Sequence, residues 1–205
     1  MLVPHDEIRS SLKGALRVLF NDPKALSYFN LTPEGFWHSF QAIWIVFVPF
    51  SITLLSQRSW LMSVHELSLE AFPSATFFAV KIFGIGVEWA LMPIVLWLLA
   101  DQLDIKTRYG PFIIARNWAS IITAWVYFIP TIAHIAGLII LEVMVFAHLI
   151  LLGLIVVYGF RVARLTLDKP PLFCIALVFI DFMVGLLIGE MLWSMIEPML
   201  AVPKV

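Results

Sequence analysis

Seven ionisable side chains lie inside long apolar stretches of this sequence, and they are the residues whose types and spacing could carry chemistry. They are Lys81, Glu88, Arg116, Glu142, His148, Asp181 and Glu190. Ionisable groups at membrane depth are costly, so each is expected to face a partner or a cavity and to mark a functional position. Three interpretations are open: ion pairs that hold helices in register, a path for protons or other cations, and a binding pocket for a lipid headgroup or a partner helix.

The rise of an α-helix, 1.5 Å per residue, sorts the charged members of this set into two layers. The outer layer, about 6 to 11 Å below one membrane surface, holds Lys81, Glu142 and Glu190. The inner layer lies about 21 to 22 Å below the same surface and holds Glu88 and Asp181, with Arg116 able to reach them through its long side chain. We expect Lys81 to pair with Glu190 or Glu142, and Arg116 to pair with Asp181 or Glu88.

Catalytic and metal-binding motifs are missing from the sequence. It has no Gly-x-Ser-x-Gly, no His-Glu-x-x-His, no P-loop and no Rossmann glycine pattern. Cys174 is the single cysteine, which allows no internal disulfide and no cysteine metal cluster. His134 and His148 fall on neighbouring spans at depths that differ by about 12 Å, which argues against a shared haem. We therefore expect a protein that is not an enzyme and that holds no metal and no cofactor.

The elements that must position these residues follow from composition. Of 205 residues, 61% are hydrophobic and 13% are charged, whereas soluble domains are about 45 to 50% apolar and 25% charged. A water-soluble globule is excluded, and a net charge of −1 argues against a nucleic-acid partner. The sequence predicts an all-α polytopic membrane bundle of five transmembrane helices, over about residues 36–55, 74–100, 112–135, 138–160 and 172–196.

Residues 1–35 predict a cytoplasmic amphipathic segment ahead of a transmembrane domain over residues 36–205. Apolar residues recur at spacings of three and four between His5 and Phe20, while Arg9, Lys13 and Arg17 lie four apart on one flank. This interfacial helix either lies on an anionic leaflet through its basic flank or packs beneath the bundle. Thr32, Pro33 and Glu34 then predict a capped helix start before the first span.

Orientation follows from the alternation of basic residues between the two sides of the predicted bundle. One side has two, Arg58 and Lys204, and the other has ten: Arg9, Lys13, Arg17, Lys24, Lys106, Arg108, Arg116, Arg161, Arg164 and Lys169. The positive-inside rule places the amino terminus in the cytoplasm and the carboxyl terminus outside. We expect a multi-pass protein of a bacterial cytoplasmic (inner) membrane.

Gly185 and Gly189 form a Gly-x-x-x-Gly pair in the fifth span, a spacing that lets two helices approach closely. The contact could lie within the chain or between two copies. Both alternatives are open from the sequence.

Three features of the sequence resemble those of the bacterial branch of the Yip1-domain membrane proteins. They are the segment 19–26 before the first span, five closely spaced spans, and the pattern from Trp118 to Pro130 followed by a hairpin with almost no loop. The resemblance covers most of the chain in topology and spacing, although the Asp-Leu-x-Gly-Pro motif of the eukaryotic members is absent. It implies a non-enzymatic integral membrane protein that acts through partners or bilayer organisation.

Two functions are therefore expected. The first is a membrane scaffold or partner-binding subunit, whose partners are the lipid bilayer and other membrane proteins or a second copy. The alternative is a small transporter or ion-conducting subunit that uses Lys81, Glu88, Asp181 and Glu190. A continuous cavity joining the two polar layers would favour transport, whereas dry, paired charges would favour the scaffold.

Overall fold

The computed structural model describes residues 3–200, in which all regular structure is helical, as predicted. The elements are α1 (His5–Leu19), a short 3-10 helix η1 (Ala25–Tyr28), α2 (Pro33–Phe40), α3 (Ala42–Val64), α4 (Ser74–Leu99), α5 (Lys106–Ile135), α6 (Leu141–Leu167) and α7 (Pro171–Leu200). Five segments are long and apolar enough to cross a membrane: Pro33–Val64, Ser74–Leu99, Lys106–Ile135, Leu141–Leu167 and Pro171–Leu200. The chain is a multi-pass membrane protein, and residues 201–205 of the predicted domain lie outside the described part.

The first span differs from its prediction at its carboxyl end. We expected a hydrophilic break after residue 55, but α3 continues as a helix to Val64. The reason is that Arg58 finds partners while remaining helical: its Nε donates to the Ser74 hydroxyl at 3.1 Å and its guanidinium lies 5.4 Å from the centre of the Phe72 ring. Arg58 therefore holds the connection between α3 and α4 in place without interrupting α3.

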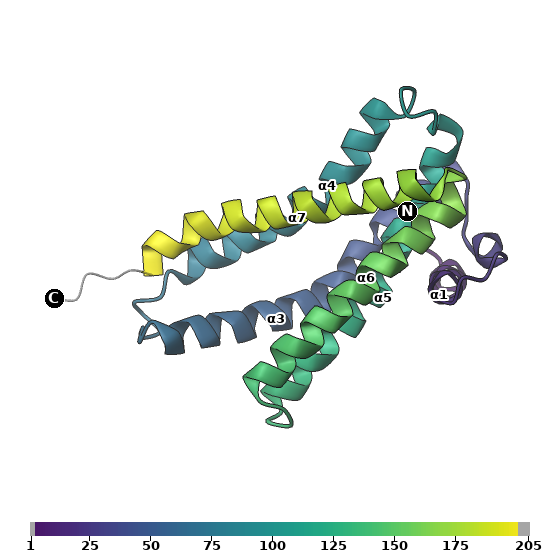
Figure 1. Ribbon diagram of the computed structural model, residues 1–205. Coiled ribbons are helices and arrows are strands. Elements are labelled where there is room, and N and C mark those ends of the chain that lie inside the picture. The colour runs from purple at the N-terminus through teal and green to yellow at the C-terminus, as the bar shows by residue number, and fades with distance from the viewer. Residues whose placement is uncertain (1–2, 201–205) are drawn as a thin grey trace.

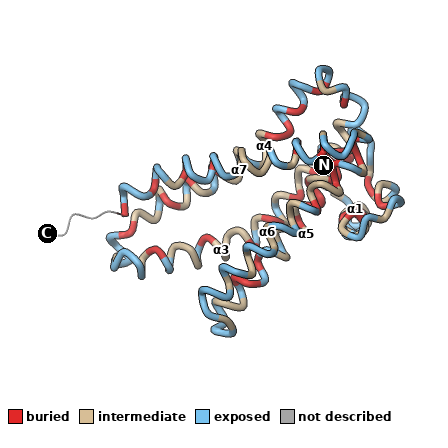
Figure 2. Tube along the Cα trace, in the orientation of Figure 1, coloured by how far each residue is buried: buried red, intermediate tan, exposed pale blue. Residues whose placement is uncertain are grey.

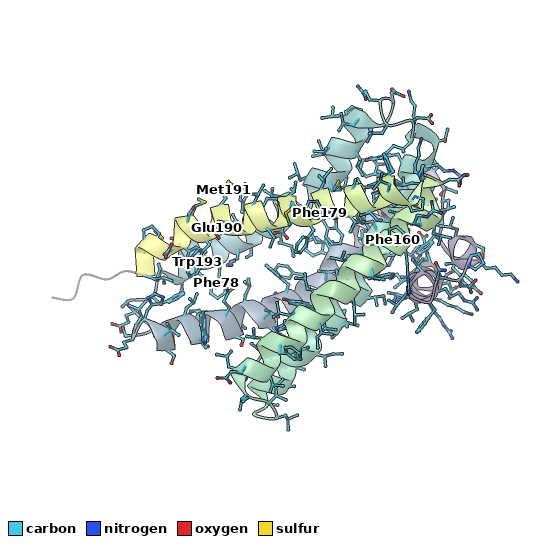
Figure 3. The ribbon with its side chains drawn as sticks, viewed as in Figure 1. Phe78, Phe160, Phe179, Glu190, Met191 and Trp193 are labelled. Carbon is cyan, nitrogen blue, oxygen red and sulfur yellow. The ribbon has the colours of Figure 1, made fainter. Side chains whose placement is uncertain are left out.

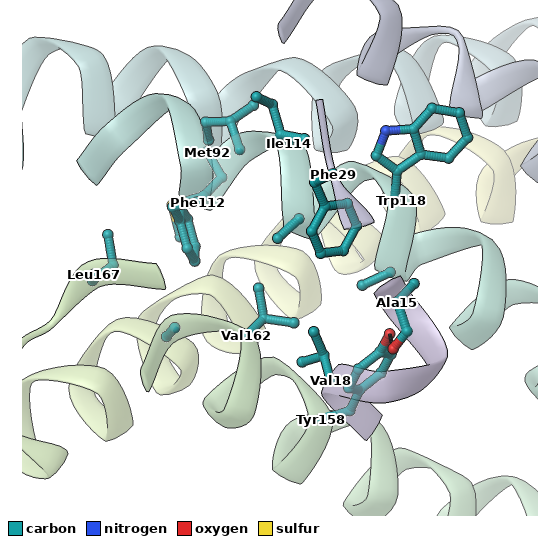
Figure 4. Packing of buried hydrophobic residues seen from close by; sticks show 14 of the residues in the cluster. Ala15, Val18, Phe29, Met92, Phe112, Ile114, Trp118, Tyr158, Val162 and Leu167 are labelled. Atoms are coloured by element: carbon teal, nitrogen blue, oxygen red, sulfur yellow. Dashed lines mark hydrogen bonds between the residues drawn. The ribbon is translucent and has the colours of Figure 1, made fainter. Parts of the chain in front are cut away.

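α5 is the central helix of the bundle. Half of its most apolar stretch is buried, against 6% for α6, and it packs against α1, α2, α3 and α6. Small residues such as Ala115 and Ala119 allow this close approach, and Trp118 fills the space beside them with 1% of its surface exposed. Figure 4 shows this core around Trp118, Phe112 and Val162.

The bundle has a closed end, which we call the basal end, and an open end (Figures 1 and 2). At the basal end, α1 and α2 pack with the starts of α5 and α7 and the ends of α4 and α6 around one core. Away from it the helices diverge into two arms. The three-helix arm joins the later part of α3, the first half of α4 and the second half of α7 around the core of Leu54, Leu61, Phe77, Leu192 and Ile196. The hairpin arm is the later half of α5 with the first half of α6.

The tip of the hairpin arm is the short turn predicted from the sequence. Gly137 adopts a left-handed conformation (φ 72°), which glycine tolerates without steric cost. One ring nitrogen of His134, Nδ1, lies 3.0 Å from the carbonyl oxygen of Ile139 and closes the turn. α5 and α6 are thereby held side by side at this end.

The amino-terminal helix α1 packs onto the bundle through its small residues. Ser11, Gly14, Ala15 and Val18 are buried, and the Tyr158 hydroxyl on α6 donates to the Ala15 carbonyl at 2.7 Å (Figure 4). This favours the packed interpretation for that face. The Thr32 hydroxyl accepts from the Gly35 amide at 3.2 Å, so the predicted cap of α2 is confirmed.

The basic flank of α1 divides between two roles. Arg9 is exposed and remains available to headgroups. Lys13, although exposed, lies 5.1 Å from the centre of the Tyr28 ring, and Arg17 pairs with Asp22 at 2.5 Å and stacks on the same ring. Only part of the predicted membrane-surface patch is therefore free.

Candidate functional site

The predicted pairing of Arg116 with Asp181 is present at the junction of the two arms. The guanidinium of Arg116 on α5 donates to both carboxylate oxygens of Asp181 on α7, at 3.2 and 3.4 Å. Charge-assisted, two-oxygen contacts of this kind are stronger and more directional than neutral hydrogen bonds. The pair ties α5 to α7 where the helices begin to separate.

Glu88 on α4 belongs to the same layer but has no close partner. Its side chain makes no hydrogen bond or ion pair with any residue from 3 to 200, and interacts with Lys81, Arg116 and Asp181 only at longer range. An ionised carboxylate in an apolar membrane interior is expensive unless it is paired. Glu88 is therefore the group at this site with unused binding capacity.

The outer layer expected from the sequence is not assembled, so the predicted pairing of Lys81 with Glu190 or Glu142 is wrong. Lys81 has no acidic side chain within 4 Å in the described chain, and Glu190 and Glu142 are exposed. The physical reason differs for the two acids. Glu142 lies at the start of α6 in the hairpin arm, apart from α4, whereas Glu190 is in the same three-helix arm as Lys81 but lies on the exposed surface of α7 (Figure 3).

Two cavities meet at the Arg116 layer. One of about 370 Å³ lies among α3 to α7, and another of about 520 Å³ lies between α4 and α7 beside α5. Five residues line both: Glu88, Met92, Arg116, Leu177 and Asp181. Volumes of this size suit inserted side chains or small ligands. Neither cavity is lined by Lys81, Glu142 or Glu190, so neither joins the two predicted layers.

Trp89 adds a hydrogen-bond donor that sequence reasoning missed. Its indole Nε1 is buried without a partner in the described residues, and the side chain lines the smaller cavity. The hydroxyls of Ser120 and Thr123, which also line it, donate to carbonyls of their own helix. Trp89 directly follows Glu88, and this adjacency was the available signal. The described residues thus leave one acceptor group, Glu88, and one buried donor, the Trp89 Nε1, without a hydrogen-bond partner beside this cavity.

Two histidines, His134 and His148, hold the hairpin arm together. His148 stacks on Tyr127 with the ring centres 4.3 Å apart, and its Nε2 lies 3.0 Å from the Tyr127 carbonyl oxygen. His134 closes the turn as described above. Over residues 3–200, no group of three or more His, Cys, Asp or Glu side chains could hold a metal ion.

The Gly-x-x-x-Gly pair makes no helix contact within the chain. Side-chain carbons added at Gly185 or Gly189 would meet nothing within 4 Å. The close approach of α4 and α7 occurs instead at Gly84, against Leu192. The contact within the chain is therefore wrong for Gly185 and Gly189, and the contact between copies stays a prediction.

A second polar cluster, also missed from the sequence, joins α1 to α2 at the basal end. His38 is 5% exposed, and its Nδ1 lies 2.9 Å from a carboxylate oxygen of Glu7. The Asn30 amide donates to the same oxygen at 3.3 Å. This cluster fixes the amino-terminal helix and faces neither cavity.

Comparisons with protein families, with curated proteins and with solved structures find no match to this chain.

Proposed function

We propose that this protein is a non-enzymatic membrane protein that binds a transmembrane helix of a partner protein at the junction of its two arms. The observation that carries the proposal is Glu88, an unpaired carboxylate that lines two cavities where the helices diverge. Transmembrane helices associate through close packing and interhelical polar contacts. A partner helix at the junction would supply both, and the chain would act as a scaffold or partner-binding subunit.

The alternative, a small transporter or ion-conducting subunit, has less support. A transport path needs polar groups that follow one another across the membrane, and both cavities end at one charged layer. Lys81 and Glu190, which would continue the path, line neither of them.

The location we propose is a bacterial cytoplasmic membrane, with the basal end in the cytoplasm. The loops and helix ends at the basal end carry most of the basic residues, including Arg108, Arg161, Arg164 and Lys169, while Arg58 lies near the far end. Reporter fusions test this. A fusion after Lys169 should read cytoplasmic, and fusions after Glu70 or Val205 should read external; a cytoplasmic reading after Glu70 would reverse the assignment.

Partner binding can be tested by filling the smaller cavity with a large side chain. Gly159 on α6 lines it, so Gly159→Phe should block an incoming helix. Gly153, on the same helix, is exposed with nothing within 4 Å of an added side chain, so Gly153→Phe is the matched control. Tagged proteins are purified from native membranes, and membrane proteins are quantified by mass spectrometry.

A stoichiometric partner should accompany the wild type and Gly153→Phe and be lost from Gly159→Phe, with all three proteins equally stable in detergent. Equal recovery from both variants would contradict binding at the junction. Proton flux in liposomes that hold the purified protein alone, abolished by Glu88→Gln, would establish the transport alternative instead.

A further inference from the structure

The charges at the junction do not balance among themselves. Arg116 is neutralised by Asp181 at 3.2 Å, which leaves Glu88 as an additional acidic group facing the same cavities. The nearest free cation along α4 is Lys81, seven residues away, a rise of about 10 Å along the helix. The site therefore lacks one cation close to Glu88.

The depth of Glu88 restricts what can provide that cation. Eleven residues separate it from the end of α4 at Leu99, a distance of about 17 Å along the helix. This is close to the middle of a hydrocarbon core about 30 Å thick. Lipid headgroups lie at the surface, whereas a side chain on a transmembrane helix reaches this depth.

We propose that the partner helix carries a lysine or arginine near its middle and that this side chain pairs with Glu88. The inference rests on the proposed function and identifies the chemistry of the partner. Met92 and Leu177, which line both cavities beside the charges, form an apolar surface for the stem of the basic side chain.

Three model helices test the proposal. Each is a leucine and alanine peptide long enough to span the bilayer, with lysine, leucine or glutamate at the central position. The full chain is reconstituted in phosphatidylcholine vesicles with a dye at its amino terminus, and association is measured by energy transfer to a dye on the peptide. A central position sits at the depth of Glu88 whichever way the peptide inserts.

The lysine peptide should associate roughly tenfold more tightly than the leucine peptide with the wild type, a size expected of an intramembrane polar contact. Glu88→Gln should bring this ratio to about one, and Glu88→Lys should transfer the preference to the glutamate peptide. Glu190→Gln removes a carboxylate that lines neither cavity, so the tenfold ratio should persist.

Equal association of the lysine and leucine peptides, or a lysine preference that survives Glu88→Gln, would overturn the inference. If Gly159→Phe still displaces the leucine peptide in that case, helix binding stands and only the basic partner is lost. If no peptide distinguishes the wild type from Gly159→Phe, helix binding fails as well. A lysine preference that disappears when phosphatidylethanolamine is added would assign the cation to a lipid headgroup and overturn the inference.

Discussion

Along α5, Trp118 is 1% exposed at the basal end, whereas Trp125, two turns further on, is 42% exposed. The neighbouring helices show the same difference in exposure between their two ends. The difference along α5 arises because α1 and α2 cover this helix only at the basal end. There the side chains next to Trp118 are small, such as Ala115 and Ala119, and helices approach closely. Beyond them α5 keeps mainly α6 as its neighbour. The short helices α1 and α2 therefore close this bundle as much as its long helices do.

Polar contacts follow the same division. At the basal end they cross between helices: Arg116 bonds Asp181, the Tyr158 hydroxyl donates to the Ala15 carbonyl, and the Tyr109 hydroxyl donates to the Pro93 carbonyl at 3.0 Å. In the arms the cross-helix contacts stay within one arm: Arg58 on α3 donates to Ser74 on α4, and His148 on α6 lies 3.0 Å from the Tyr127 carbonyl oxygen on α5. The basal end is therefore held by hydrogen bonds among several helices, whereas within residues 3–200 no hydrogen bond or ion pair joins one arm to the other.

The largest expected effect comes from emptying the basal core. Trp118→Ala should reduce the free energy of unfolding by about 3 to 5 kcal/mol, since a fully buried aromatic side chain is lost. Trp125→Ala, on the same helix in the hairpin arm, should cost less than about 1 kcal/mol. Reversible unfolding in mixed micelles measures both. Similar losses would remove the contrast between the two ends.

The next largest effect compares the inner charge layer, whose ion pair forms, with the outer layer, whose predicted pair does not. Arg116→Leu should destabilise the protein by roughly 1 to 3 kcal/mol because it leaves Asp181 unpaired, and adding Asp181→Leu should recover much of that loss. Lys81→Met and Glu190→Gln do not contact each other, so their effects should add within about 0.5 kcal/mol. Double-mutant cycles on thermal stability in detergent provide the test. Coupling between Lys81 and Glu190 would show that the two side chains reach each other within the three-helix arm.

A smaller effect locates the close contact within the three-helix arm. Gly84→Ala places a methyl group against Leu192, which must move, and should cost about 1 kcal/mol. Gly185→Ala meets open space, so the change should be neutral or slightly stabilising through helix propensity. The two melting temperatures in detergent decide the matter. A larger loss at Gly185 would point to contact between copies.

The smallest effect concerns the turn after α1 at the basal end. The amide of Lys24, which donates to Asp22, and the nearby Arg17 guanidinium lower the pKa of the Asp22 carboxyl below its ordinary value of 3.8. A lowered pKa stabilises the fold above the ordinary value, and the contribution is lost as the pH falls through the lowered one. Carboxyl NMR should place the midpoint below 3.8. Arg17→Gln should raise it only partly; an unshifted wild-type midpoint would contradict the turn geometry.

Apolar length and turn chemistry made the helices of this fold predictable. Thr32 marked the start of α2, and Ala136 and Gly137 marked the hairpin, because both signals are local. The pairing of Arg116 with Asp181 was also predictable, since depth along nearly parallel helices suffices at the basal end. The same arithmetic failed for Lys81, because depth does not say which way a side chain faces, as at Glu190, or how far apart two helices lie once they diverge, as at Glu142. Divergence depends on which neighbours cover each helix, and no local pattern encodes it.

α5 and α7 are each 30 residues long, about 45 Å along the axis, which exceeds a hydrocarbon core of about 30 Å. A helix that is too long for its bilayer is accommodated by tilting. Divergence of the arms tilts these helices away from each other and shortens their projection along the membrane normal. Membrane thickness therefore sets how far the arms spread: a thin bilayer widens the space between them, and a thick one narrows it.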